Sequence, residues 1–220
     1  MTILAVTGLT REAQIIGGPG VVAVAGGGDA KGLAEKLDAL HGDIIGVISI
    51  GLGGALSPLL KVGDVIIADK IVGPLESHNC DSLWMSTLVA RISGATVAHI
   101  AGSSTIIADK ASKWALYSDS GAAVVDMESL VAARFAGSRN LKFAALRVIS
   151  DDANHTLPPA ALVAMKPDGG IAIGRVLGSL LRHPFQVPQL IRTARASNKA
   201  FAELLRCRDL CGVGLAGLDV

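Results

Sequence analysis

The feature that most constrains the fold of this chain is an apolar run in its second half. Residues 143–149 are apolar except for Arg147, and the run ends abruptly in Ser150, Asp151 and Asp152. Such a run is typical of a strand that is buried on both faces of a parallel sheet. Ligands bind beyond the carboxyl ends of the strands in sheets of this kind, so the sequence predicts a binding site at Asp151.

Arg147 interrupts this run, and a buried guanidinium is costly unless carboxylates or a ligand satisfy it. Two acids earlier in the chain are candidate partners, because each follows another strand-like run. They are Glu12, in TGLTREA, and Glu128, in VVDMES. An arginine with strand-end acids around it predicts a catalytic pocket rather than an exposed surface.

Strand-like runs alternate with helix-like segments at residues 29–40 and 128–136, which predicts an α/β protein. Half of the 220 residues are hydrophobic, only 3% are aromatic and 26 are glycine, a mixture that fits tight packing of small side chains. We expect one domain with a central mixed, mostly parallel twisted sheet flanked by helices. The strand-like runs lie at residues 3–6, 21–25, 44–50, 65–68, 95–100, 123–125 and 143–149.

Composition and short motifs exclude several classes of function. The formal net charge of +1 argues against a general nucleic-acid binder. Three cysteines make no disulfide framework, which favours a reducing cytoplasm, and Cys207 and Cys211 have no second pair that would complete a zinc site. GGPG and GGGDAKG lack the register of a dinucleotide-binding motif and predict turns. We therefore expect no metal and no organic cofactor.

Four motifs in a fixed order resemble the nucleoside phosphorylase/nucleosidase superfamily. They are GLTREA (residues 8–13), SIGLGGALSPLLKVGD (49–64), VVDMES (124–129) and LRVISDDA (146–153). The nearest well-known branch is the methylthioadenosine/S-adenosylhomocysteine nucleosidases, and the resemblance covers about residues 1–180. The tail is similar to hopanoid-biosynthesis-associated nucleosidase/phosphorylases, which implies removal of adenine from adenosylhopane to give ribosylhopane.

The resemblance implies a role for each acid. Asp151 matches the acid that donates a proton to purine N7, so that adenine leaves as a neutral base, and this task requires a pKa raised by burial. Glu12 matches the carboxylate that activates water opposite the leaving group. Glu128 matches the carboxylate that accepts hydrogen bonds from the ribose 2′- and 3′-hydroxyls.

The resemblance also implies the surroundings of these acids. Met127 matches a thioether packed on the sugar, and Arg147 and Ser150 match residues that fix the carboxylates and the acid loop. Ile106 and Ile107 fall where the family holds adenine. Gly53 and Gly54 let the backbone approach a ligand closely, with tight strand packing as the equally weighted alternative.

Three departures from the family bear on the nucleophile. Leu52 replaces a serine common in nucleosidases, and Ile50 stands where phosphorylases tend to hold phosphate with an arginine. Glu12 occupies the place of a second phosphate-binding arginine, although the adjacent Arg11 could partly substitute. A carboxylate repels a phosphate dianion and suits a water, so we expect hydrolysis. The alternatives are phosphorolysis with phosphate as co-substrate, plain methylthioadenosine/S-adenosylhomocysteine cleavage, and a catalytically silent nucleoside sensor.

We expect a catalytic domain at residues 1–181 and a basic amphipathic helical tail at 182–220 packed on the same domain. Residues 171–208 hold seven Lys or Arg and one acid, Glu203. The tail either packs on the core with a solvated basic face or docks on anionic lipid at the inner face of the membrane. The resemblance further implies a homodimer in which a partner residue, in the segment 79–85, closes the pocket for the 5′ substituent. The apolar stripe expected on the tail comprises Val187, Leu190, Ile191, Ala194, Asn198, Phe201 and Leu205.

Overall fold

The computed structural model describes residues 1–162, 166, 168–170 and 172–219, and it contains one mixed sheet of eight strands. The strand order is β2-β1-β3-β7-β6-β4-β5, and β8 pairs with both β3 and β4. Five of the eight strand pairings are parallel, so the expected mixed, mostly parallel sheet is confirmed. The strands are β1 (Thr2–Thr7), β2 (Val21–Ala25), β3 (Ile44–Ala55), β4 (Val65–Val72), β5 (Ser77–Asn79), β6 (Thr96–Gly102), β7 (Val124–Asp126) and β8 (Lys142–Asp151).

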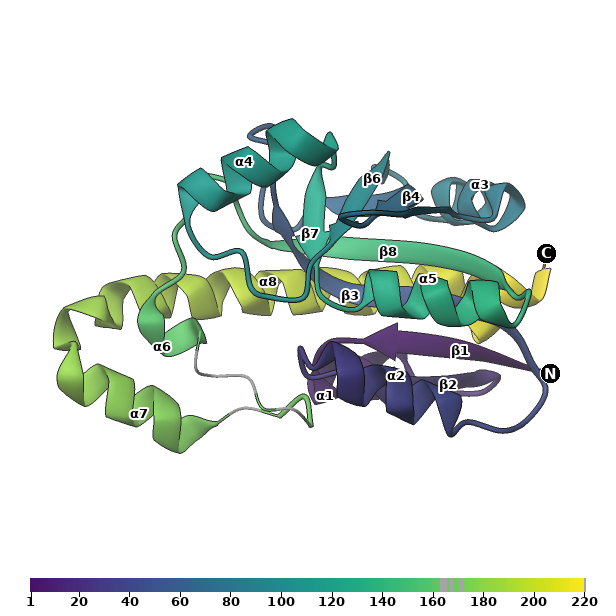
Figure 1. Ribbon diagram of the computed structural model, residues 1–220, viewed down its shortest axis with the longest axis horizontal. Helices are drawn as coiled ribbons and strands as arrows, with labels where there is room; N and C mark the ends of the chain where they lie inside the picture. Colours follow the sequence, from purple (N-terminus) through teal and green to yellow (C-terminus); the bar gives the residue numbers. More distant parts are fainter. Residues whose placement is uncertain (163–165, 167, 171, 220) are drawn as a thin grey trace.

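Helices cover both faces of the sheet, and α6 and α7 stand away from it at one end (Figure 1). The long helix α8 runs from that end along the sheet toward the C-terminus. The helices are α1 (Thr10–Ile16), α2 (Ala30–Asp38), α3 (Ser82–Arg91), α4 (Lys110–Ser120), α5 (Ser129–Ser138), α6 (Pro159–Leu162), α7 (Ile173–Arg182) and α8 (Val187–Cys211), with 3-10 turns η1 (Pro184–Gln186) and η2 (Val213–Asp219).

Two large apolar clusters form most of the core, one on each face of the sheet, and a smaller one surrounds Leu56. Ile3 belongs to the cluster that includes side chains of α3 and α8, and its neighbour Leu4 belongs to the cluster that includes side chains of α2 and α5. Successive residues of a strand point to opposite faces, so a strand covered on both sides must be apolar at every position. This explains why β1 and β8 appear in the sequence as nearly continuous apolar runs.

The central strand β3 is longer than predicted. It continues from Ile44 through its glycines to Ala55, whereas we expected it to end at Ile50 in a glycine turn. A Cβ on Gly53 would lie 2.7 Å from Cγ1 of Val124, so this glycine lets β7 pack against β3. Neighbouring strands impose the absence of a side chain here, as in the tight strand packing that the sequence offered as one of two interpretations of Gly53.

The tail follows the prediction only in part. In α8 the buried residues are Ala200, Phe201, Leu204, Cys207 and Cys211. Leu205, which we had placed on the packed stripe, is 46% exposed, because the adjacent Leu204 faces the core instead. The first half of α8 buries none of its side chains fully. The two cysteines are therefore core residues, and the boundary at 181/182, which stays a prediction, falls at the end of α7.

Candidate active site

Glu12 is held at the end of β1 by three backbone N–H groups. It is the third residue of α1 and is only 2% exposed. Its Oε2 accepts hydrogen bonds from the N–H groups of Gly8 and Leu9, each at 2.7 Å, and its Oε1 accepts one from the N–H of Leu52 at 2.8 Å. The side chain of Leu52 packs against the core, so only its backbone serves the site.

The surroundings of Glu12 determine its pKa and leave one of its oxygens able to accept a further hydrogen bond. Burial raises the pKa of its carboxyl group, against the opposing effect of the N–H groups of Leu9, Leu52 and Gly8 and of the Arg147 charge. Oε1 receives a single hydrogen bond, so it keeps a lone pair for a water. A buried carboxylate of raised pKa is suited to work as a general base.

Glu128 lies beside Glu12, as the sequence predicted. It is 6% exposed at the start of α5. A Cβ placed on Gly8 would lie 3.3 Å from Oε2 of Glu12 and from both oxygens of Glu128, so the two carboxylates converge on this glycine. Burial, together with the charges of Asp126 and Glu12, raises the pKa of Glu128 to about 8 against the opposing effect of the Arg147 charge.

This raised pKa makes stability depend on pH. Between the ordinary value of 4.5 and about 8, folded Glu128 holds a proton that the unfolded chain has released. The free energy of unfolding must therefore fall as pH rises through this window and level off above it. We expect Glu128→Gln to abolish this fall in the free energy of unfolding. The melting temperature of the variant, relative to that of the wild type, should therefore increase from about pH 5 to about pH 8. Exposed Glu35→Gln on α2 is the control, and a pH-independent difference for Glu128→Gln would contradict the assignment.

Arg147 is paired with Asp126, and our prediction of Glu12 or Glu128 as its partner was wrong. The guanidinium is 1% exposed, and its Nη2 ion-pairs with Oδ2 of Asp126 and donates to Ser49 Oγ at 2.6 Å. Asp126 also accepts a hydrogen bond from Ser129 Oγ at 2.5 Å. The positive charge of Arg147 lowers the pKa values of both glutamates, against the larger effect of burial. One feature of the sequence could have indicated Asp126 as a partner. It follows two valines at the end of a strand-like run, as the other acids follow theirs.

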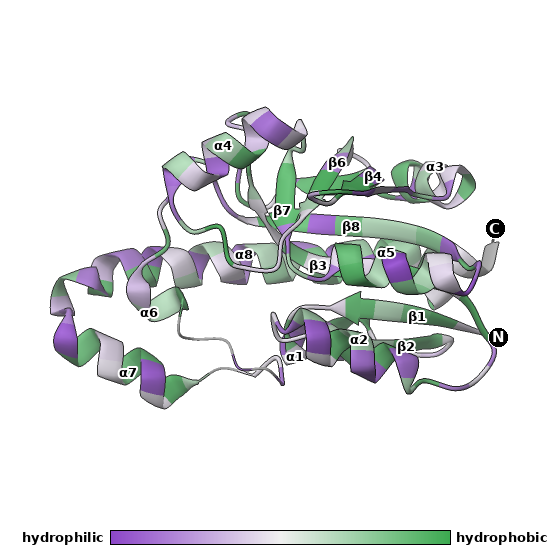
Figure 2. Cartoon of the chain, in the orientation of Figure 1, coloured by the Kyte–Doolittle hydropathy of each residue, from purple (hydrophilic) through white to green (hydrophobic). Residues whose placement is uncertain are grey.

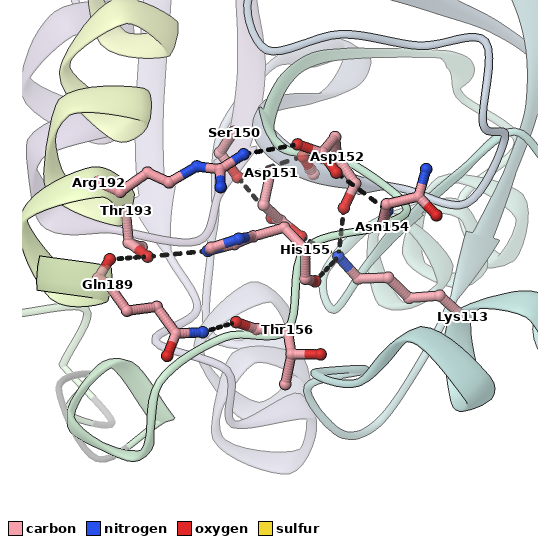
Figure 3. Close-up of polar contacts among 11 residues, drawn as sticks. Lys113, Ser150, Asp151, Asp152, Asn154, His155, Thr156, Gln189, Arg192 and Thr193 are labelled. Carbon is pink, nitrogen blue, oxygen red and sulfur yellow. Dashed lines mark hydrogen bonds and ion pairs between the residues drawn. The ribbon is translucent and has the colours of Figure 1, made fainter. Parts of the chain in front are cut away.

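Asp151 is paired with a buried lysine that sequence analysis missed. Lys113 on α4 is fully buried, and its Nζ ion-pairs with Oδ2 of Asp151. The same nitrogen donates to the carbonyl oxygens of Asp152 at 2.9 Å and His155 at 3.1 Å (Figure 3). The sequence KASKWAL resembles any solvated helix start, so it gave no signal that this lysine is buried.

The remaining predicted residues lie around the acid loop and the glutamates. Ser150 Oγ lies 3.1 Å from Oδ1 of Asp151 and 3.2 Å from the carbonyl oxygen of Gly53. A Cβ on Gly54 would lie 3.3 Å from Oδ2 of Asp151, so that glycine makes room for the acid. Met127, Ile106 and Ile107 are half-buried, the first next to Glu128 and the other two between β6 and α4.

A cavity of about 450 Å³ opens beside the loop that follows Asp151. Most of its lining residues are polar or cationic, and neither Glu12 nor Glu128 is among them, so the cavity does not lie between these two carboxylates. The lining residues are Lys110, Asn154, His155, Thr156, Pro188, Gln189 and Arg192.

A family model described as the phosphorylase superfamily matches residues 8–182. The chain belongs to the phosphorylase superfamily. It is an enzyme of the nucleosidase and phosphorylase class, and every carboxylate described above lies inside the matched range of the superfamily. No curated protein matches the chain in sequence.

Solved structures share the fold of this superfamily member at low sequence identity. S-adenosylhomocysteine nucleosidase from Streptococcus pyogenes superposes with a TM-score of 0.64 at 16% identity, over 92% of this chain and 96% of that one. Methylthioadenosine/S-adenosylhomocysteine nucleosidase from S. pneumoniae gives 0.63 at 18%, over 94% and 99%. Futalosine hydrolase from Helicobacter pylori gives 0.56 at 17%, over 68% and 90%.

The described residues hold no group of three or more His, Cys, Asp and Glu side chains placed to bind a metal ion. In the same part of the chain, no helix has both the length and the apolar character needed to cross a membrane.

Proposed function

We propose that this enzyme hydrolyses the N-glycosidic bond of an adenine nucleoside. The observation that carries the proposal is the convergence of Glu12 and Asp151 on β3, with Glu128 beside Glu12. Glu12 follows β1, Asp151 ends β8, and these two strands pair with β3 on either side. Glu12 contacts β3 at Leu52, and Asp151 lies beside Gly54, while Glu128 meets Glu12 at Gly8. Buried acids with separate surroundings are what acid–base cleavage of a glycosidic bond requires.

Each acid has a task in this reaction. As the bond between C1′ and N9 breaks, its electron pair passes to adenine and N7 takes a proton from Asp151. Glu12 takes a proton from the water whose oxygen attacks C1′. Glu128, when ionised, accepts hydrogen bonds from both ribose hydroxyls, one on each carboxylate oxygen.

Of the two positions where phosphorylases tend to hold phosphate with arginine, one offers only Arg11, which is engaged elsewhere, and the other is Ile50, which supports water as the nucleophile. Arg11 donates to Oδ1 of Asn198 at 3.2 Å and stacks on Phe201 with its guanidinium carbon 4.1 Å from the ring centre. Ile50 is fully buried in the core. Phosphorolysis is the second candidate, since the superfamily includes it.

For the substrate we propose an adenine nucleoside with a bulky apolar 5′ substituent, with adenosylhopane as the candidate. The segment 79–85 lies at the amino end of β8, far from Asp151, because the N–H of Asp81 donates to the carbonyl of Phe143 at 2.7 Å. It could therefore line the 5′ pocket only as part of a partner subunit in a homodimer. Trp84 is fully buried, which leaves its exposed neighbours such as Leu83 for that contact.

An apolar surface on α7 and η1 supports lipid contact by this enzyme. Ile173, Leu177 and Leu181 are 68%, 55% and 86% exposed at spacings of four residues, and Phe185 is 96% exposed. Figure 2 shows apolar and strongly hydrophilic residues interleaved along α7. Residues 172–202 contain five Lys or Arg and no Asp or Glu, which suits anionic lipid. We propose that the enzyme works at the inner face of the membrane through this surface.

The lipid contact predicts a specific loss of vesicle binding. We expect the wild type to co-sediment with vesicles containing an anionic phospholipid at low salt, and the double variant Leu181→Glu/Phe185→Glu to bind them at least about tenfold more weakly. The matched control is Leu59→Glu/Leu75→Glu, which changes two leucines that are 83% and 100% exposed elsewhere. Equal binding by both double variants would contradict a docking role for α7.

The function itself is tested by adenine release. Methylthioadenosine and adenosylhopane in detergent are each incubated with the enzyme, with and without phosphate. We expect release from adenosylhopane without phosphate. Strict dependence on phosphate would favour phosphorolysis, and turnover of methylthioadenosine alone would reject the lipid-linked substrate.

A further inference from the structure

We infer that Lys113 supplies the proton that Asp151 passes to the leaving adenine, so that the acid of this enzyme is a lysine–aspartate pair. The inference rests on the proposed cleavage of an N-glycosidic bond. It assigns a positioning residue on α4, outside the four motifs, to that reaction.

Lys113 is buried, and its ammonium group donates to protein atoms. Its side chain is 1% exposed, and its ammonium group has three N–H donors. They reach Oδ2 of Asp151 at the end of β8 and, in the loop that follows, the carbonyl oxygens of Asp152 and His155 (Figure 3). Among the described residues, Asp151 is the only carboxylate that forms an ion pair with Lys113.

The pairing changes what Asp151 alone can do. A carboxylate in contact with an ammonium group is charged, and a charged carboxylate accepts protons rather than donating one. Adenine N7 also presents a lone pair, so an ionised Asp151 would have no proton to offer it. The pair as a whole still holds one proton, on Nζ of Lys113.

The proton therefore moves in two linked steps. As the bond between C1′ and N9 breaks, N7 gains basicity and takes a proton from Asp151, while Asp151 takes a proton from Nζ. Lys113 is left as a neutral amine, which lysine can become in a buried site. Water restores the proton to Lys113 after adenine leaves, and the proton taken up by Glu12 returns to solvent, so the overall reaction is hydrolysis.

The competing explanation is that Lys113 only stabilises the loop after β8. The variant Lys113→Arg distinguishes this structural role from proton donation. Lys113→Arg keeps a positive charge for the ion pair, but a guanidinium does not give up its proton in proteins. Lys113→Met removes both charge and proton. We expect kcat for adenine release to fall about 10²-fold in both variants at about pH 8, with little change in KM.

Acid pH is the second readout. In Lys113→Met, Asp151 can still take a proton from solvent, so the ratio of wild-type to variant kcat should shrink to about tenfold or less near pH 5. The ratio at each pH cancels the titration of Glu12, which both proteins share. His155, Asp152 and Arg192 also face the pair, and burial together with the charges of Arg192 and Lys113 lowers the pKa of His155, so the comparison is repeated in a His155→Gln background. Lys31→Met on α2, whose side chain is 89% exposed, is the control for loss of a lysine.

The double variant Lys113→Met/Asp151→Asn distinguishes an effect on catalysis from an effect on folding, because it removes both buried charges. We expect its melting temperature to exceed that of Lys113→Met, and its kcat to equal that of Asp151→Asn, because the lysine acts only through the aspartate. Near wild-type kcat in Lys113→Arg, or a ratio that does not change with pH, would overturn the relay. A wild type that releases no adenine from any nucleoside would instead reject the proposed function.

Discussion

Replacement of Glu12 by glutamine is expected to lower kcat for adenine release about 10³-fold, with KM changed by less than about threefold. The carboxylate takes a proton from the attacking water, and an amide cannot. The three groups that hold Glu12 are all backbone N–H donors, from Gly8, Leu9 and Leu52. The NH2 end of a glutamine must therefore face at least one donor, so the side chain also loses its fixed position.

Two measurements separate this chemical effect from a change in folding. The melting temperature of Glu12→Gln shows how much of the fold is retained, and Glu35→Gln, an exposed carboxylate on α2, should keep the activity of the wild type. A folded Glu12→Gln protein that kept kcat within about fivefold would remove Glu12 from the mechanism.

Arg147→Met is expected to produce the largest loss of stability, about 3–5 kcal/mol in the free energy of unfolding. Methionine leaves the charge of Asp126 buried without its partner, and Ser49 loses its hydrogen bond to Nη2. Both members of this pair have side chains that are at most 1% exposed, so water cannot replace the lost partner. Urea unfolding monitored by circular dichroism measures the change.

A surface ion pair of the same kind is the control. Arg134 pairs with Glu76, and their side chains are 56% and 34% exposed. Arg134→Met should therefore cost about 1 kcal/mol or less. Asp126→Asn added to Arg147→Met should recover part of the stability, because it removes the unpaired charge. Equal losses for Arg147→Met and Arg134→Met would contradict the account of the buried pair.

The sequence predicted the strands well because burial on both faces leaves a strong local pattern. The apolar run before Asp151 and the position of Glu12 after β1 are visible without knowledge of any contact. The partner of Arg147 was not predictable in this way. A buried guanidinium requires a carboxylate, but the choice of Asp126 over Glu128 depends on how β7 and β8 are placed around β3.

Lys113 shows the same limit more clearly. It is 38 residues from Asp151 in sequence and is the one fully buried residue of α4. Lys113 pairs with Asp151 only because the loop after β8 passes over the start of α4. The sequence shows that Leu52 stands where nucleosidases commonly have a serine. It does not show that the backbone N–H of Leu52 donates a hydrogen bond to Glu12.

The origin of the oxygen that ends on C1′ tests the central claim most directly. The reaction is run in ¹⁸O-labelled water with phosphate present, and the sugar product is analysed by mass spectrometry. The account predicts a free sugar that carries one ¹⁸O atom at C1′, because Glu12 activates water. A sugar 1-phosphate without the label would contradict it.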